Sequence, residues 1–193
     1  DVPFHVMEYR EGTVIAHDFP AGTDVTEELC DAFADVVLDT LLELHDVDYR
    51  TAGLGDLGHP EGFLERQVRG WIGRYDKSRT DESPDVEALT THLSDNVPPS
   101  PPPTIIHNDY HLKNLLFDPD DPLTIRAVLD WEMTTVGDPL MDLAVFLSYW
   151  PEPGDPPAIP KILANLPLRP GFPGRQELMG RYGKRSGRDM SRM

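Results

Sequence analysis

The sequence predicts an α+β fold in which a mainly helical body carries a small β-sheet. Apolar residues recur at helical spacing in several segments, and three short apolar runs bounded by polar or turn residues have the composition of strands. Polar residues gather where those runs stop. With 193 residues, 39% of them hydrophobic, the chain can bury one core, and its length suits one domain or one large lobe of two.

The clearest helix is predicted at residues 26–45, where apolar residues return every three or four positions. Asp24 and Glu27 are predicted to form a capping box at its start. The only cysteine, Cys30, lies among the apolar positions of this helix, so we expect it to be a small core residue that forms no internal disulfide.

Three further helices are predicted, at residues 62–77, at residues 84–94 and from residue 139 onward. Pro139 fits the first turn of a helix, which tolerates proline, and Ala144 is expected on the buried face that follows. Trp71, on the apolar face of the second helix, and Trp131 are expected to be packing residues.

The three apolar runs, at residues 104–106, 115–117 and 125–129, are predicted to be strands of a single small sheet. The turn at residues 118–122 separates the last two of them. The opening residues 4–9 also alternate in polarity as a strand does, and Glu11 and Gly12 then signal a turn.

Charge and hydropathy limit the classes of partner. The chain has 34 acidic and 17 basic residues and a formal charge of −17, which would repel a phosphate backbone and argues against nucleic acid. No apolar run approaches the roughly 20 residues that span a bilayer, and the acidic opening does not resemble a signal peptide. We therefore expect a cytoplasmic protein that does not bind membranes.

The strongest chemical signal is the loop from His107 to Asn114, which follows one predicted strand and precedes the next. Asp130 ends the strand after that. Phosphoryl transfer requires a carboxylate near the acceptor hydroxyl and oxygen ligands for the magnesium ions that neutralise the triphosphate. Asp109, Asn114 and Asp130 supply these groups in one region of the chain.

This pattern, H-x-D-x-x-x-x-N followed by a strand-terminal aspartate, resembles the signature of the aminoglycoside and choline kinase group, distant relatives of protein kinases. Residues 42–48, 53–63, 128–132 and 137–144 resemble a branch of that group, the kinase-like domains of acyl-CoA dehydrogenase family proteins. The resemblance implies the carboxy-terminal lobe of a protein-kinase-like fold, with ATP and Mg²⁺ as cofactors and a small-molecule hydroxyl as phosphate acceptor.

The resemblance also implies roles for individual residues. Asp109 would orient, and could deprotonate, the acceptor hydroxyl, and His111 would lie near the transferred phosphoryl group. Asn114 and Asp130 would hold magnesium. His107 would be structural and buried, and Asp142 would brace the catalytic loop from a helix. The hinge between the lobes would bind the nucleotide through Met7, Glu8, Tyr9 and Arg10.

The resemblance divides the chain into a hinge-like segment at residues 1–15, a lobe core at residues 16–150, and a linker with the start of carboxy-terminal helices at residues 151–193. The catalytic loop would be residues 107–114 and the metal loop residues 130–138. The small lobe that normally precedes the hinge has no counterpart in the sequence, so we expect the chain alone to be catalytically silent and to bind ATP poorly.

The sequence departs from the pattern at Asn108, which replaces the glycine usual after the histidine, and at Lys113, where the branch often has an acidic residue. Three alternatives remain open. The chain could be a non-catalytic kinase-like binding module. His107, Asp109 and His111 could bind a metal in a hydrolase. Residues 53–58 satisfy G-x-G-x-x-G, but they lack the strand-turn-helix context of a dinucleotide site.

Overall fold

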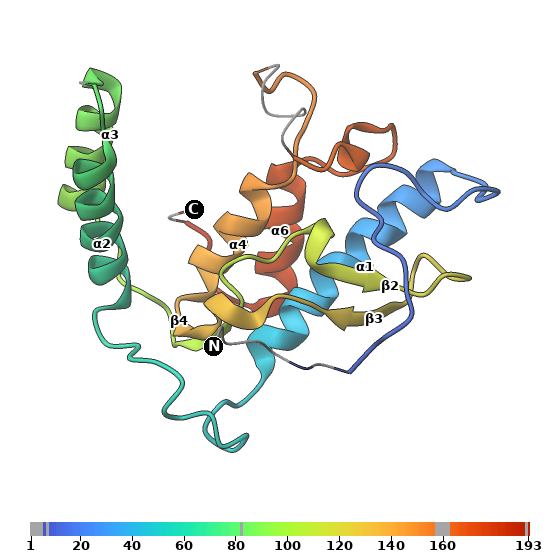
Figure 1. The fold of residues 1–193 in the computed structure, drawn as a ribbon, viewed down its shortest axis with the longest axis horizontal. Coiled ribbons are helices and arrows are strands. Elements are labelled where there is room, and N and C mark those ends of the chain that lie inside the picture. Colours follow the sequence, from blue (N-terminus) through green and yellow to red (C-terminus); the bar gives the residue numbers. More distant parts are fainter. Residues whose placement is uncertain (1–5, 7, 82, 157–162, 192) are drawn as a thin grey trace.

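A computed structural model describes residues 6, 8–81, 83–156, 163–191 and 193. Figure 1 shows a helical body flanked by short strands and, beside it, a hairpin of two helices that stands apart from the body. The main helices are α1 (Glu27–Asp46), α2 (Phe63–Ser78), α3 (Pro84–Asp95), α4 (Pro139–Ser148) and α6 (Arg175–Ser186), and short 3-10 turns are η1 (Leu112–Asn114), η2 (Trp131–Met133) and η3 (Leu166–Leu168).

Helix α1 forms the centre of the core. Its Cys30, Phe33 and Leu41 are fully buried, and the Phe33 ring stacks on Phe117 with 4.8 Å between centroids. Cys30 is therefore the core residue that the sequence predicts. The expected capping box is wrong, because Thr26 is the N-cap: it has extended backbone angles, and its side chain accepts from the Leu29 amide at 3.2 Å.

The strands form two separate ladders and not the single sheet that the sequence predicts. Strand β1 (Thr104–Ile106) pairs antiparallel with β4 (Thr135–Gly137), and β2 (Leu115–Phe117) pairs antiparallel with β3 (Ile125–Val128). The loop between β1 and β2 separates the ladders, and strands of three or four residues are too short to bridge it. Strand β4 was not predicted, because three residues ending in glycine show no alternating pattern.

Helix α4 begins as predicted, with Pro139 in its first turn and Asp138 as N-cap. Its buried face includes Leu143, Phe146 and Leu147, whereas Ala144 is exposed and its predicted burial is wrong. The apolar stripe is rotated because Phe146 fills the space against the core. This orientation also turns Asp142, in the first turn of α4, toward the catalytic loop.

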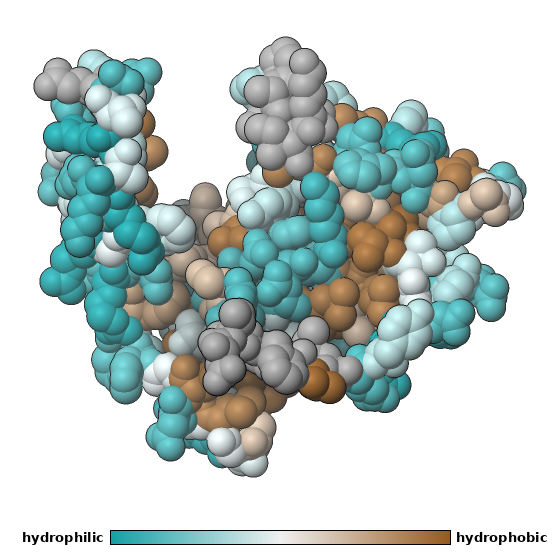
Figure 2. Space-filling view, in the orientation of Figure 1, coloured by the Kyte–Doolittle hydropathy of each residue, from teal (hydrophilic) through white to brown (hydrophobic). Residues whose placement is uncertain are grey.

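The α2–α3 hairpin leaves most of its apolar face uncovered by the body. Phe63 is the buried residue of α2, and Trp71, expected to pack, is 56% exposed. The guanidinium of Arg74 lies over the Trp71 ring, 4.1 Å from its centroid. Figure 2 shows apolar side chains on the edge of the hairpin that faces the body.

The predicted strand at residues 4–9 is not observed where the structure describes it. Residues 1–5 and 7 lie outside the described residues, and residues 8–10 are not in a strand. Within the described residues, the first pairing is an isolated bridge in which the amides of Thr13 and Phe117 each donate to the other's carbonyl, at 2.9 and 2.8 Å. Among the described helices, none has the length and apolar content needed to cross a membrane.

Candidate active site

The catalytic loop leaves β1 at His107, which is fully buried. The Asp109 amide donates to His107 Nδ1 at 3.3 Å, and His107 Nε2 lies 2.9 Å from the Leu129 carbonyl. Since Nδ1 accepts, the proton is on Nε2, which donates to that carbonyl. The buried position matches the expectation for His107, and the side chain connects the loop to the end of β3.

Asp142 of α4 anchors the backbone of this loop. Its side chain is fully buried, Oδ2 accepts from the His107 amide and Oδ1 from the Asn108 amide, both at 2.7 Å. Asn108 has φ = 65°, in the left-handed region. Asparagine adopts this region more readily than most residues, and its Nδ2 donates to the Met133 carbonyl at 2.8 Å. The substitution of glycine is thus accommodated, and it adds a link to η2.

Two buried side chains, His45 and Tyr182, extend the hydrogen bonding of Asp142 into the core. His45 Nε2 lies 3.1 Å from Asp142 Oδ2, and His45 Nδ1 lies 2.7 Å from the Tyr182 hydroxyl. Burial raises the pKa of Tyr182 well above its ordinary value. The sequence interpretation missed both partners. Although each carries a polar group at an apolar helical position, nothing in a single sequence pairs residues 97 and 137 positions apart.

Asp109 and Asn114 meet at the far end of the loop. Asn114 Nδ2 donates to the Asp109 carbonyl at 2.9 Å and to Asp109 Oδ2 at 3.1 Å. His111 Nε2 lies 3.5 Å from the other carboxylate oxygen, Oδ1. The Asp109 side chain is 31% exposed, so the carboxylate is held in place yet remains accessible to a substrate.

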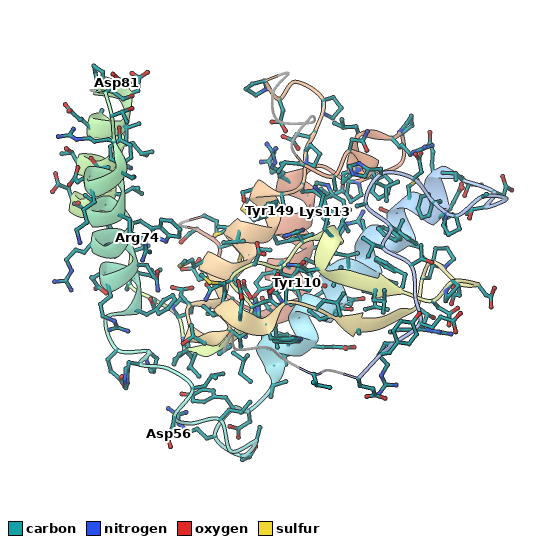
Figure 3. All side chains as sticks on the ribbon, viewed as in Figure 1. Asp56, Arg74, Asp81, Tyr110, Lys113 and Tyr149 are labelled. Carbon is teal, nitrogen blue, oxygen red and sulfur yellow. The ribbon has the colours of Figure 1, made fainter. Side chains whose placement is uncertain are left out.

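His111 is held as a neutral hydrogen-bond donor. The Lys113 amide donates to its Nδ1 at 3.2 Å, which leaves the proton on Nε2, toward Asp109. Burial lowers the pKa of His111, and this effect outweighs the opposing influence of the Asp109 charge. The ring stacks on Tyr149, at the end of α4, with 4.3 Å between centroids, and Figure 3 labels Tyr149 and, near it in this view, Lys113 of η1.

Tyr149 is a site residue that the sequence interpretation did not identify. It follows the last residue of α4, its ring stacks on His111, and it lies close enough to Asp109 for that charge to affect its pKa. Burial, and then the charge of Asp109, raises the pKa of Tyr149. Its contacts with Asp109 and His111 cross about 40 positions of sequence, and the local sequence gives no sign of them.

Asp130 lies next to this group, at the end of β3. It is exposed and has φ = 65°, and the amide of the preceding Leu129 donates to the Asn114 carbonyl at 2.8 Å. Trp131 after it is 44% exposed, although its ring lies 4.9 Å from the His107 ring. The expected packing of Trp131 is therefore partial, and the backbone brings Asp130 to the side of Asn114.

The predicted nucleotide-binding residues are not in contact with this group in the described part of the chain. Met7 lies outside the described residues. Glu8 and Arg10 are exposed and pair with each other at 2.9 Å, and Tyr9 is 86% exposed. Their predicted role in nucleotide binding stays a prediction.

The geometry argues against the hydrolase alternative. Both ring nitrogens of His107 already bond to the backbone, so neither can ligate a metal together with Asp109 and His111. Within the described residues, no group of three or more His, Cys, Asp or Glu side chains could hold a metal ion.

The dinucleotide alternative fails on context. Residues 53–58 form turns between α1 and α2, where neither a preceding strand nor a following helix N-terminus frames them. The glycine at the end of this pattern has a packing role, because a Cβ on Gly58 would overlap Thr135 Oγ1 and the Val136 amide of β4.

Comparison with known proteins relates this chain to a family. The model of a phosphotransferase enzyme family matches residues 1–178. Acyl-CoA dehydrogenase family member 11 of Mus musculus is 34% identical over 191 residues, covering 96% of this chain and 24% of the relative. The Homo sapiens protein of the same name is 30% identical over 180 residues. The chain thus spans about a quarter of the length of these curated relatives.

Solved structures of phosphotransferases share the fold of this chain. A putative aminoglycoside phosphotransferase from Ralstonia eutropha has a TM-score of 0.81 and 30% identity, covering 96% of this chain and 55% of that one. A macrolide 2'-phosphotransferase type I, at 18% identity and a TM-score of 0.63, shares the fold. These likenesses confirm the predicted α+β, kinase-like lobe and the resemblance on which it was based. The chain belongs to the phosphotransferase enzyme family.

Proposed function

We propose that this chain is the catalytic lobe of an ATP- and Mg²⁺-dependent phosphotransferase that transfers the γ-phosphoryl group to a hydroxyl of a small molecule. One observation carries the proposal: a partly exposed Asp109 carboxylate is held by the Asn114 amide, on a loop that the buried Asp142 anchors by two short hydrogen bonds. Phosphoryl transfer depends mostly on positioning and charge stabilisation. A rigid loop with an accessible carboxylate suits that task.

The side chains beside Asp109 fit a magnesium ion. Asn114 uses its Nδ2 toward Asp109, so its amide oxygen lies on the opposite side of the group. Asp130 is exposed and directly follows Leu129, whose amide is hydrogen-bonded to the Asn114 carbonyl, so its carboxylate extends from backbone next to Asn114. Oxygen donors of this kind are the ligands that magnesium prefers. When bound, the ion would neutralise the negative charge of the phosphates, and Asn114 and Asp130 would hold it.

Asp109 and His111 would act on the reacting groups. Asp109 accepts a hydrogen bond from the acceptor hydroxyl and so orients its oxygen toward the phosphorus. His111, which is kept neutral by burial, donates from Nε2 and can stabilise an anionic oxygen on the transferred group. Glu8, Tyr9 and Arg10, with Met7, remain the proposed contacts for the adenine.

The test measures ADP formation from ATP and Mg²⁺ by the full-length gene product, over a panel of hydroxylated acceptors. Asp109→Asn should lower acceptor-dependent turnover by about 10²- to 10⁴-fold, the usual effect of losing such a group. Asp120→Asn, in the exposed turn between β2 and β3, is the matched control and should not change turnover. Nucleotide binding without transfer to any acceptor would favour the non-catalytic binding module instead.

A further inference from the structure

A cleft of about 620 Å³ opens directly beside the catalytic loop. Asn108 of that loop lines it, together with residues of η2 and α2. A second hollow, a groove of about 800 Å³ between the α2–α3 hairpin and α4, shares Gln67, Trp71 and Met141 with this cleft. The two hollows therefore adjoin at these three residues, one beside the catalytic loop and the other along the hairpin.

The two hollows differ in chemistry. The groove is apolar, lined by side chains that include Leu64, Val68, Ile72, Leu93, Leu140 and Ala144. The cleft contains two arginines of α2, Arg66 and Arg74, against one carboxylate, that of Glu132. The chain as a whole has twice as many acidic as basic residues, so the charge of the cleft is opposite to that of the surrounding protein.

Among the described residues, no carboxylate lies within ion-pair distance of Arg66 or Arg74, unlike most arginines of this chain. In the described part of the chain, eight arginines lie within ion-pair distance of a carboxylate: Arg10, Arg79, Arg126, Arg169, Arg175, Arg181, Arg185 and Arg188. Arg66 instead donates to the His59 and Glu61 carbonyls. Arg74 stacks on Trp71, and Figure 3 labels it on the hairpin.

We propose that the phosphate acceptor is an anionic amphiphile, whose carboxylate or phosphate binds at Arg66 and Arg74 while its apolar part lies in the groove along the hairpin. The planar guanidinium binds such oxyanions through two parallel hydrogen bonds, and the stacking of Arg74 on Trp71 holds one guanidinium in place. The identification of this ligand as the acceptor rests on the proposed function. Its binding does not.

The test uses the 193-residue chain without nucleotide, so that it is independent of phosphoryl transfer. Calorimetric titration compares decanoate, decyl phosphate, decanol and the decyltrimethylammonium cation below their aggregation limits. Tryptophan fluorescence that is lost in Trp71→Phe reports on the site, because the Trp71 indole is exposed and lines the cleft. We expect both anions to bind at least about tenfold more tightly than decanol, because each gains charge-assisted hydrogen bonds that the alcohol cannot make, and the cation to bind most weakly. The ratio of the affinities for decanoate and decyl phosphate shows whether the site prefers a carboxylate or a phosphate headgroup.

Variants separate the site from general charge effects. Arg74→Gln should weaken decanoate binding about tenfold. Arg69→Gln, on the same helix and outside the cleft, removes the same charge and should leave binding unchanged. Equal binding of decanol and decanoate, equal effects of the two substitutions, preference for the cation, or no binding of any probe would each overturn the proposal. Circular dichroism confirms folding, which the exposed position of Arg74 should preserve.

Discussion

Replacing Asp142 with alanine should destabilise the whole lobe, because this carboxylate is the acceptor for two buried backbone amides. His107 and Asn108 donate to it at 2.7 Å each, and its side chain is fully buried. A buried donor left without an acceptor costs about 1–3 kcal/mol. Two such amides predict a loss of about 2–6 kcal/mol, a large part of the roughly 5–15 kcal/mol that holds a typical domain folded.

Urea unfolding followed by circular dichroism measures this free energy. Asp120→Ala, in an exposed turn, is the control and should change stability by no more than about 0.5 kcal/mol. Hydrogen exchange at the Asn108 amide gives a local measure, since the amide should lose its protection in Asp142→Ala. A loss below about 1 kcal/mol, with the Asn108 amide still protected, would refute the anchoring role of Asp142.

Three other properties follow from the structure. Cys30, fully buried with its pKa raised by burial, should react with a thiol reagent such as Ellman's reagent only when the chain unfolds; rapid reaction of the native chain would contradict its core position. Hydrogen bonds from Arg181 and Arg185 lower the pKa of Asp35 despite the opposing effect of burial, so the stabilisation by Asp35 is present at neutral pH. Asp35→Asn should therefore destabilise the chain at pH 7, and its effect on the free energy of unfolding should vanish as the pH falls from about 4 through the lower folded pKa. Urea unfolding at several pH values measures this effect, and an effect that stays constant with pH would contradict the role of the charge. Burial keeps the pKa of His111 below its ordinary value, so its ring signals in NMR should titrate below the usual histidine midpoint of about 6.5, and titration at or above that midpoint would refute the buried, stacked position.

The spacing of apolar residues predicted the helices well, because each helix carries its own repeat of buried positions within its local sequence. The segments predicted at residues 26–45, 62–77 and 84–94 correspond to α1, α2 and α3 within one residue at each end. The sheet was harder, since a strand of three residues is defined by its partner. Strand β4 therefore escaped prediction, and one expected sheet proved to be two ladders.

The candidate site divides in the same way. The loop from His107 to Asn114 and the position of Asp130 follow from a contiguous motif, so the sequence identified them. Tyr149, His45 and Tyr182 contact that machinery from helices distant in sequence. Their side chains become recognisable only when the fold brings α1, α4 and α6 together.

We propose above that Asn114 and Asp130 form one metal–nucleotide site beside Asp109. Paramagnetic broadening tests this site even where binding is as weak as we expect for this chain alone, because a briefly bound Mn²⁺ ion already broadens nearby signals. Mn²⁺ with excess ATP is added to the isotope-labelled chain, and the side-chain amide signal of Asn114 is compared with that of the exposed Asn96. We predict strong broadening of Asn114 at metal levels that leave Asn96 sharp, and its loss in Asp130→Ala. An unaffected Asn114 amide, with broadening confined to the acidic turn at residues 118–121, would contradict the account.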